Sequence, residues 1–334
     1  MLIKTRRGWE LPESAATPES VYLDRRTLAK AIAAGPIIAA ASAMPFATAH
    51  AAAVMELIEE QLADDPTLDL YPAPLNDTYP AGRAITDEEL NSTYNNFYEF
   101  SSGKQVWLRV ADLPRRPWSV TFDGLVEEEK TVDIDTLIRA MTLEERVYRH
   151  RCVERWAMVV PWTGFPLSKL VEYARPLGSA KYVVMQTFEM PDIAPQQLLA
   201  ADSFPWPYTE GVTMEEAMND LAFMVTGAYG HPVANQMGAP LRLHLPWKYG
   251  FKSVKSIVRV SFTEERPRTF WEELVPSEYG FWANINPEVP HRRWSQDEEE
   301  LLGTNERIPT QIYNGYGEYV AHLYDGLENE ALYM

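Results

Sequence analysis

The sequence predicts a mixed α+β fold with a single core, which extends from about residue 90 to the end of the chain. Its hydrophobic content of 46% and aromatic content of 12% over 334 residues are typical of a folded globular protein. Several segments are rich in β-branched and aromatic residues and are bounded by Gly, Pro or Asp, as strands are. Segments with helical spacing of apolar residues separate these strands at irregular intervals. This irregular order favours a mixed fold over a regular alternation of strand and helix.

The predicted elements follow from these patterns in chain order. Strands are predicted over residues 104–110, 118–126, 180–188, 221–229, 241–247 and 256–263. Helices are predicted over residues 133–141, 165–178 and 213–220. The last of these opens with Thr213 and Glu216 at the spacing of a capping box. The acidic segment 294–303 predicts an exposed helix, and residues 315–320 predict a turn into a terminal strand.

The N-terminal 51 residues resemble a cleaved export leader. A pair, Arg25 and Arg26, precedes an apolar stretch of modest hydrophobicity that ends in alternating small residues. The pair and the residues after it resemble a twin-arginine signal. That route exports proteins already folded, often with a cofactor inserted, so a cofactor is expected. Residues 52–89 are then predicted to form an extended N-terminal arm, and residues 90–334 the main domain.

The charge distribution singles out one segment. The net charge of -18 argues against a general nucleic-acid-binding protein, because phosphate backbones are bound by clustered Lys and Arg. Residues 221–263 contain no Asp or Glu, yet they carry Arg242, Lys248, Lys252, Lys255 and Arg259. Part of this stretch reads as core strand, where charge of either sign is rare. The loop around Gly250 does not have the pattern of a core strand. Its backbone N–H groups, together with Lys252 and Lys255, predict a site for an anionic group such as a phosphate.

Cys152 is the only cysteine of the chain and stands among Arg149, His150, Arg151 and Arg155. A lone cysteine forms no internal disulfide and no zinc site that needs several thiolates. Three interpretations stay open at this point. The thiol is a small buried hydrophobe, a nucleophile whose pKa the neighbouring cations lower, or a metal ligand whose partners come from a cofactor.

Three blocks of sequence carry a family resemblance. Residues 94–100 (YNNFYEF), 151–167 (RCVERWAMVVPWTGFPL) and 238–257 (GAPLRLHLPWKYGFKSVKSI) resemble the sulfite-oxidase-type molybdopterin enzymes, over about Tyr94 to Tyr313. The resemblance is strongest to the bacterial periplasmic branch that reduces methionine sulfoxide. It implies a mixed α+β, sulfite-oxidase-type molybdopterin-binding fold. It also implies that residues 90–334 form a single molybdopterin-binding catalytic domain with one molybdenum–molybdopterin cofactor per chain.

The resemblance also implies roles for individual residues. Cys152 matches the cysteine that ligates molybdenum. The positions that match cofactor contacts are Asn95, Tyr98, Glu99, Thr187, Met237, Arg242, Ser253, Val254 and Lys255, the last three in the phosphate-binding loop. Met237 replaces an asparagine of close relatives, so one amide contact to the pterin is lost unless Asn235 compensates.

Three further residues have alternative roles. Glu154 is a candidate catalytic acid, for which a salt bridge to Arg151 or Arg155 is the alternative. Trp156 and Trp162 are expected to pack in the core or to form an aromatic wall for a methionine side chain.

The function implied is the reduction of methionine sulfoxide, free or in oxidised periplasmic proteins. Electrons must come from outside the chain, because it has no CxxCH motif and too few cysteines for an iron–sulfur cluster. The resemblance implies a membrane-bound haem b subunit as their source. The twin-arginine export machinery is the other expected partner. The alternatives are sulfite oxidation, a metal-free thiol enzyme using Cys152 with His150 or another base, and a non-enzymatic binding protein. Sulfite, a small dianion, would need several cations converging on the metal.

Overall fold

The computed structural model describes residues 52–199 and 204–334. The chain divides into two compact units, Met1–Ala53 and Val54–Met334, and the second contains the elements described below. The export leader predicted over residues 1–51 lies outside the described residues. Within the described ranges, no helix is long and apolar enough to cross a membrane.

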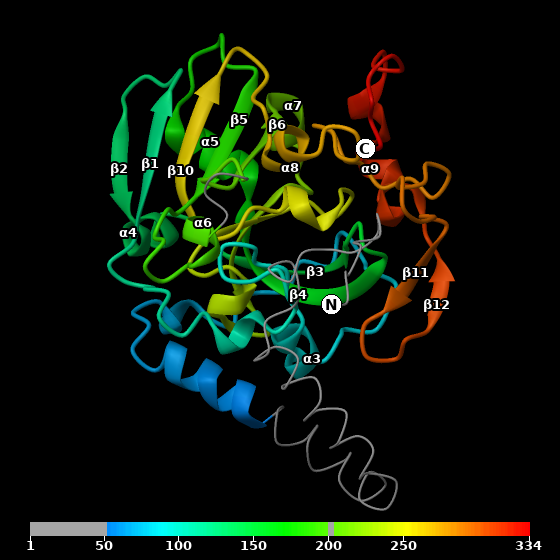
Figure 1. The fold of residues 1–334 in the computed structure, drawn as a ribbon. Helices are drawn as coiled ribbons and strands as arrows, with labels where there is room; N and C mark the ends of the chain where they lie inside the picture. The colour runs from blue at the N-terminus through cyan, green and yellow to red at the C-terminus, as the bar shows by residue number, and fades with distance from the viewer. Residues whose placement is uncertain (1–51, 200–203) are drawn as a thin grey trace, which may run out of the picture. The chain divides into compact units, whose positions relative to one another are not determined.

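The first sheet has five strands in the order β2-β1-β10-β5-β6 (Figure 1). Their bounds are β1 Ser119–Gly124, β2 Lys130–Asp133, β5 Tyr182–Thr187, β6 Thr209–Thr213 and β10 Ile257–Thr263. β1 and β10 pair in parallel, with Thr121 opposite Arg259, whereas the other pairs are antiparallel. Val120 and Phe122 of β1 are fully buried and alternate with more exposed residues, as expected for a strand with one face on a core.

The second sheet has seven strands, with β12-β11-β4-β7-β8 in order, β3 beside β4 and β9 beside β7. Their bounds are β3 Glu144–Arg151, β4 Trp156–Pro166, β7 Phe223–Ala228, β8 His231–Pro232, β9 Arg242–His244, β11 Glu298–Leu301 and β12 Arg307–Pro309. β3 and β4 form a long antiparallel ladder that ends with Arg151 opposite Ala157. Residues 152–155 make the tight turn that joins these two strands, and the Cys152 N–H donates to the Trp156 carbonyl at 3.0 Å. The single cysteine therefore lies at a hairpin turn.

The helices are short. They are α3 Glu88–Thr93, α4 Ile134–Arg139, α5 Leu167–Ala174, α6 Gln196–Leu199, α7 Met214–Met218, α8 Phe270–Leu274 and α9 Gly317–Val320, and residues 52–62 are also helical. The 3₁₀ turns are η2 Leu68–Leu70, η3 Val106–Leu108, η4 Asn235–Met237, η5 Gly250–Lys252, η6 Ile312–Gly315 and η7 Ala321–Tyr324. The capping box predicted for α7 is confirmed, since the Thr213 hydroxyl accepts from the Glu216 N–H and the Glu216 carboxylate from the Thr213 N–H.

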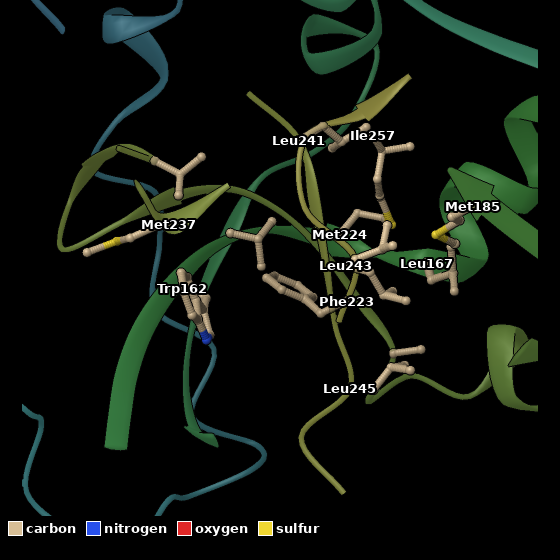
Figure 2. Close-up of a cluster of buried hydrophobic side chains, with 14 of the residues drawn as sticks. Trp162, Leu167, Met185, Phe223, Met224, Met237, Leu241, Leu243, Leu245 and Ile257 are labelled. Atoms are coloured by element: carbon tan, nitrogen blue, oxygen red, sulfur yellow. The ribbon is translucent and has the colours of Figure 1, made fainter. Parts of the chain in front are cut away.

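The core joins the two sheets (Figure 2). Phe223 and Met224 of β7 and Leu243 of β9 gather close to Leu167 of α5 and Met185 of β5 in this cluster, and all are buried. All six residues of β7 are buried, because neighbouring elements cover both faces of this strand. Burying each such side chain stabilises the fold by about 1.5–3 kcal/mol, so this cluster fixes the position of β9, which carries residues of the site.

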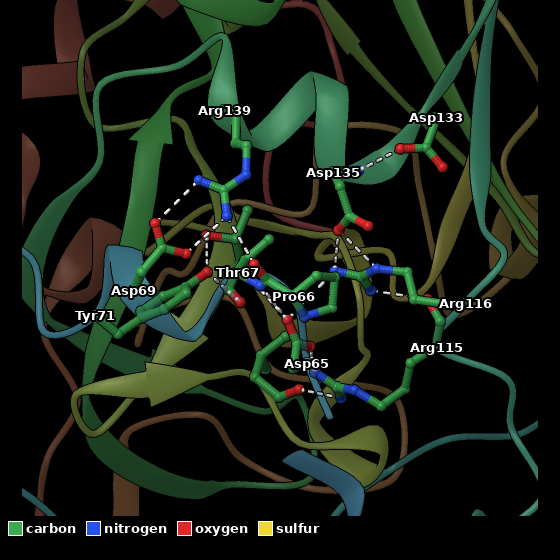
Figure 3. A network of polar contacts seen from close by, with 12 residues as sticks. Asp65, Pro66, Thr67, Asp69, Tyr71, Arg115, Arg116, Asp133, Asp135 and Arg139 are labelled. Carbon is green, nitrogen blue, oxygen red and sulfur yellow. Dashed lines mark hydrogen bonds and ion pairs between the residues drawn. The ribbon is translucent and has the colours of Figure 1, made fainter. Parts of the chain in front are cut away.

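Residues 54–89 are tied to the rest of this unit by polar contacts (Figure 3). Asp65 accepts from the Arg115 guanidinium at 2.8 Å and from the Thr67 hydroxyl at 2.6 Å. Arg139 of α4 donates to Asp69 at 2.7 Å. Burial raises the pKa of Asp65, but the hydrogen bonds from Thr67 and Arg115 outweigh it, so this pKa lies below its ordinary value.

Five of the six strand predictions are confirmed, by β1, β5, β7, β9 and β10, and α4, α5 and α7 confirm the helices. The strand predicted over residues 104–110 is wrong. This segment contains the 3₁₀ turn η3, in which the consecutive residues Val106 and Trp107 are both buried. Alternation of faces in a strand would separate them.

Two C-terminal predictions are also wrong. Residues 298–301 form strand β11 instead of an exposed acidic helix, and residues 317–320 form α9 instead of a strand. Glu299 of β11 is fully buried, where it contacts Arg83 and Arg151. The acidic composition suggested a solvated face, but two arginines from distant segments neutralise this carboxylate inside the protein.

Candidate active site

A cavity of about 440 Å³ lies over the hairpin turn that carries Cys152. Four stretches far apart in sequence contribute most of its lining: residues 91–99, 150–162, 237–255 and 271–294. A volume of several hundred cubic ångströms is typical of sites for cofactors and small substrates.

The structure brings most of the predicted site residues together around this cavity. Ten of the eleven line it: Asn95, Tyr98, Glu99, Cys152, Glu154, Met237, Arg242, Ser253, Val254 and Lys255. Thr187 does not line it. It is buried and its hydroxyl donates to the Ser256 carbonyl at 3.3 Å. Burial raises the pKa of Glu99 to about 7, and Thr187 is among the groups that oppose this rise. Thr187 therefore lies behind Glu99.

The thiol of Cys152 is nearly enclosed, with 5% of the residue exposed. Its sulfur lies 3.5 Å from the Asn96 amide nitrogen, 3.5 Å from the Glu154 backbone nitrogen and 3.6 Å from Glu154 Oε2. Burial raises the pKa of the Cys152 thiol to about 12, and the negative charge of Glu154 raises it further. The expectation that neighbouring arginines favour the thiolate is therefore wrong for the protein alone.

The arginines beside Cys152 have other partners. Arg151 donates to Glu299 at 3.1 Å and to Gln296 at 2.8 Å. Arg155 points toward the exposed Glu298, at 3.6 Å. These guanidinium groups therefore contribute little positive charge at the sulfur.

Glu154 is held by three donors. Its Oε2 forms an ion pair with Lys104 and accepts from Trp156 Nε1 at 3.0 Å and from Asn96 Nδ2 at 3.2 Å. Burial raises the pKa of Glu154, but the hydrogen bonds from Lys104 and Trp156 outweigh it, so this pKa lies below its ordinary value. The salt bridge considered with Arg151 or Arg155 is not formed. The carboxylate is charged at neutral pH, which does not suit a proton donor.

His150 lines the cavity but does not activate the thiol. Burial holds the pKa of His150 well below its ordinary value. In the described part of the chain no hydrogen bond joins it to Cys152, and its ring lies 5.7 Å from that of Trp156. Among the described residues, the hydrogen-bonded pair of Cys152 and His150 considered for a metal-free thiol mechanism is thus not formed.

The cations of the acid-free segment differ in their pairing. Lys248 pairs with Glu216 and Lys252 with Glu210, each at 2.5 Å and fully buried. Lys252 is therefore not available to an anion, so the prediction that it helps to cradle one is wrong. Its partner comes from β6, outside the segment.

Arg242 and Lys255 form no ion pair with a carboxylate, although the buried Glu99 of the same cavity acts on Lys255 electrostatically. Arg242 is buried and donates only to backbone carbonyls, including that of Met237 at 2.6 Å. Across the two described ranges, Lys255 forms no hydrogen bond or ion pair. Burial lowers the pKa of Lys255 to about 7 and that of Arg242 to about 9. An anionic group in the cavity would stabilise both positive charges.

Several lining residues were not identified from the sequence. Asn96 and Lys104 contact the thiol or Glu154, and only the paired asparagines of the YNN motif hinted at Asn96. An aromatic wall runs through Tyr98, Trp271 and Tyr279, with ring centroids 5.0 and 5.1 Å apart. Trp271 and Tyr279 lie in segments without a motif, so no local signal could have found them.

Comparisons with known proteins agree with this site. Residues 108–271 match the family described as "Oxidoreductase molybdopterin binding domain". The protein-methionine-sulfoxide reductase catalytic subunit MsrP of Burkholderia mallei is 41% identical over 326 residues, which cover 96% of this chain and 95% of that protein. The chain belongs to the MsrP family. The expected molybdopterin-binding fold and family are thereby confirmed.

A solved structure gives a weaker match to this MsrP family chain. The sulfane dehydrogenase SoxCD of Paracoccus pantotrophus has a TM-score of 0.42 and 13% identity, and the match covers 71% of this chain and 66% of that chain.

The cavity of this MsrP family member fits a molybdopterin group. Arg242 and Lys255 present unpaired positive charge suited to a phosphate. The buried Oδ1 of Asn95 has no hydrogen-bond partner and is a ready acceptor for a polar ring. The thiol of Cys152 in the same cavity is a soft ligand suited to molybdenum.

The lost asparagine amide at Met237 is not replaced by Asn235. The Asn235 amide nitrogen donates to the carbonyls of Val110 and Leu113 at 3.1 and 3.0 Å, and its oxygen accepts from Arg115. All groups of this amide therefore have partners within the protein. Met237 lines the cavity, where its side chain offers only apolar contact and a weak sulfur acceptor.

Proposed function

We propose that this chain reduces methionine sulfoxide, free or in oxidised proteins, to methionine in the periplasm. The observation that carries the proposal is the thiol of Cys152 in one cavity with the unpaired cations Arg242 and Lys255. The MsrP relative is named as a protein-methionine-sulfoxide reductase. In the reaction the sulfur–oxygen bond of the sulfoxide breaks, two electrons and two protons are consumed, and a thioether and water form.

The residues of the chain have separate tasks in this proposal. The molybdenum cofactor, one per chain, supplies the two-electron and oxygen-transfer chemistry. Cys152 holds the metal through its thiolate. Lys255, with Ser253 and Val254 beside it, binds the phosphate end, and Arg242 contacts the pterin. Asn95, Tyr98, Glu99 and Met237 contribute further contacts around the cofactor, and Thr187 supports Glu99 from behind.

The surroundings of the thiol favour a sulfoxide over sulfite. Glu154, which lies beside the sulfur, is paired with Lys104, so their charges largely cancel, and the cations Arg242, Lys255 and Arg293 line the same cavity. Arg151 and Arg155 are engaged by carboxylates of the β11 strand. In this proposal Arg242 and Lys255 are taken up by the cofactor, so a dianion at the sulfur would meet the negative charge of Glu154, whereas a neutral sulfoxide has no such penalty. The aromatic wall of Tyr98, Trp271 and Tyr279 suits a thioether side chain.

The partners follow from the same proposal. The name of the relative, a catalytic subunit, supports a second subunit. Electrons would come from a membrane-bound haem b subunit, since the sequence contains no CxxCH motif and one cysteine. Residues 1–51 would direct export through the twin-arginine machinery, with residues 52–89 as an arm on the catalytic domain 90–334. Oxidised periplasmic proteins would be the substrates.

Molybdenum analysis of the exported protein tests the proposal. The native protein and the Cys152→Ser variant are assayed with a reduced dye and methionine sulfoxide, and separately with sulfite. About one molybdenum per chain and sulfoxide reduction are expected for the native protein, with loss of activity in the variant. Native protein without molybdenum, from cells that make the cofactor, would refute the proposal. Sulfite oxidation without sulfoxide reduction would support the sulfite oxidase alternative.

A further inference from the structure

We infer that Lys104 and Asn96 are positioning residues that hold the Glu154 carboxylate beside the Cys152 sulfur. The inference deepens the proposed function, on which it rests, because it concerns the groups that surround the metal ligand.

Lys104, Asn96 and Glu154 contact one another in a small network beside the Cys152 sulfur. The Lys104 ammonium contacts both Glu154 Oε2 and Asn96 Oδ1. The Asn96 amide nitrogen lies 3.2 Å from Glu154 Oε2 and 3.5 Å from the Cys152 sulfur. Trp156 adds a third donor to the same carboxylate oxygen, at 3.0 Å. One oxygen is thus fixed by three donors, two from residues 96–104 and one from Trp156, two residues after Glu154.

The other carboxylate oxygen stays free. Among the residues that the structure describes, none donates a hydrogen bond to Glu154 Oε1. The Glu154 side chain is 33% exposed, so this oxygen is available to water or to a bound substrate. A carboxylate that is anchored through one oxygen offers the second in a fixed orientation, which is what positioning of a reacting group requires.

The local fold explains why Lys104 and Asn96 act together. The Asn95 N–H donates to the Lys104 carbonyl at 3.0 Å, which closes the loop between them. The Lys104 ammonium also lies 5.9 Å from the Tyr94 ring and 6.0 Å from the Trp156 ring, within reach of cation–π attraction. Residues 94–104, which include cofactor contacts expected from the family, are in this way fastened to the turn of Cys152.

The charges explain why a cation is needed at this place. A metal-bound Cys152 is a thiolate, so without Lys104 two negative groups would lie about 3.6 Å apart. Repulsion would then turn the Glu154 carboxylate away from the sulfur. The pair itself contributes little to folding, since both side chains are partly exposed. Removal of Lys104 is therefore expected to change the orientation of the Glu154 carboxylate beside the metal, and to change the stability of the fold little.

Four variants of the full-length, cofactor-loaded protein test the inference: Lys104→Met, Lys104→Arg, Asn96→Leu and the control Lys169→Met. Lys169 forms only an exposed pair with Glu172. The readouts are molybdenum content, kcat and KM for methionine sulfoxide, and the electron paramagnetic resonance signal of Mo(V).

Lys104→Met and Asn96→Leu should each lower kcat by about 10- to 100-fold and alter the Mo(V) signal, with molybdenum content unchanged and KM within about threefold. Lys104→Arg should restore kcat to within about threefold, since the guanidinium keeps the charge. The Lys169 variant should match the native protein.

Two results would overturn the inference. One is a kcat within about twofold of the native value and an unchanged Mo(V) signal in Lys104→Met. The other is a molybdenum loss that matches the loss of activity, which would assign Lys104 to cofactor retention. Native protein that binds molybdenum but reduces no sulfoxide would refute the proposed function instead, and the Mo(V) signals of the variants would still test the positioning.

Discussion

Glu299 forms a buried ion pair with Arg151, whose guanidinium also donates to the backbone carbonyl of Cys152. Arg151 Nε lies 3.1 Å from Glu299 Oε2, and both side chains are fully buried. Arg83 is a second cationic partner of the same carboxylate. Arg151, the residue before the expected metal ligand, therefore forms its ion pair with Glu299 of β11. This pair links β3 to β11 within the second sheet.

Replacement of Glu299 by Gln should strongly destabilise the protein. The change leaves Arg151 and Arg83 without their buried counter-charge, which costs about 3–5 kcal/mol in the free energy of unfolding. Urea unfolding of the cofactor-free protein measures this loss. The matched control is Glu300→Gln in the same strand, whose carboxylate forms only a 3.6 Å contact with the exposed Arg307. The control should change stability by less than about 0.5 kcal/mol, and equal effects of the two variants would contradict the buried pair.

Lys252→Met should mainly lower the stability of the protein, whereas Lys255→Met should mainly weaken cofactor retention. Lys252→Met leaves Glu210 buried without a partner and should cost about 3–5 kcal/mol of stability. Lys255 forms no direct ion pair, and burial lowers its pKa to about 7 against the weaker opposing effect of Glu99, so Lys255→Met should change the stability of the cofactor-free protein by less than about 1 kcal/mol. It should instead weaken cofactor retention by roughly tenfold or more, as expected for the loss of a charge-assisted hydrogen bond.

Urea unfolding and molybdenum content, measured at about pH 8 on both Lys variants, separate these two effects. Full molybdenum retention in Lys255→Met would show that this lysine does not bind the cofactor.

The ion pair of His231 and Glu88 should make stability depend on pH. One ring nitrogen lies 2.6 Å from Glu88 Oε1 and the other 2.9 Å from the Pro232 carbonyl, so both acceptors are satisfied only by the protonated ring. Burial lowers the pKa of His231, but these hydrogen bonds outweigh it and the pKa lies above 6.5. The stabilisation is therefore fully present below the unfolded pKa of 6.5 and is lost as pH rises through the folded pKa.

Thermal unfolding between about pH 5 and 9 tests this linkage, with His231→Gln as the comparison. The native protein should have the higher Tm at low pH, and the difference should shrink as pH rises. A difference in Tm that is constant over this range would contradict the linkage.

Strand prediction succeeded for segments rich in β-branched and aromatic residues, and it missed β3, in which arginines are buried, and also β4, which contains no charged residue. β10 was found because apolar residues recur at every second position, and β5 because it is a continuous run of β-branched, aromatic and other apolar residues. Strand β3 was not predicted, because it contains Arg146 and Arg151, and arginine is typical of exposed positions. Both are buried, since Asp220 and Glu299 approach them from distant segments. The sequence around β3 therefore gives no indication that these two arginines are paired and buried.

In the candidate active site, too, motifs predicted some residues correctly, whereas contacts between distant segments were not predicted. Cys152 and most of the expected cofactor contacts were named from motifs, and the structure gathers them around one cavity. Glu154 was named with the wrong partner, because sequence proximity suggested an arginine. Its partner Lys104 is 50 residues away in the chain and meets it only through the loop that Asn95 closes.

The sequence by itself determined the single thiol, the family blocks and the segment without acidic residues. Only the tertiary structure decided which cations of that segment remain for a ligand. Glu216 and Glu210 lie outside the segment in sequence but beside it in space, where they neutralise Lys248 and Lys252. Arg242 and Lys255 form no ion pair with a carboxylate and line the cavity, and burial lowers the pKa of Lys255 to about 7 even though the Glu99 carboxylate opposes this shift. The physical reason is that a buried charge is governed by the groups within a few ångströms, and distant strands supply those groups.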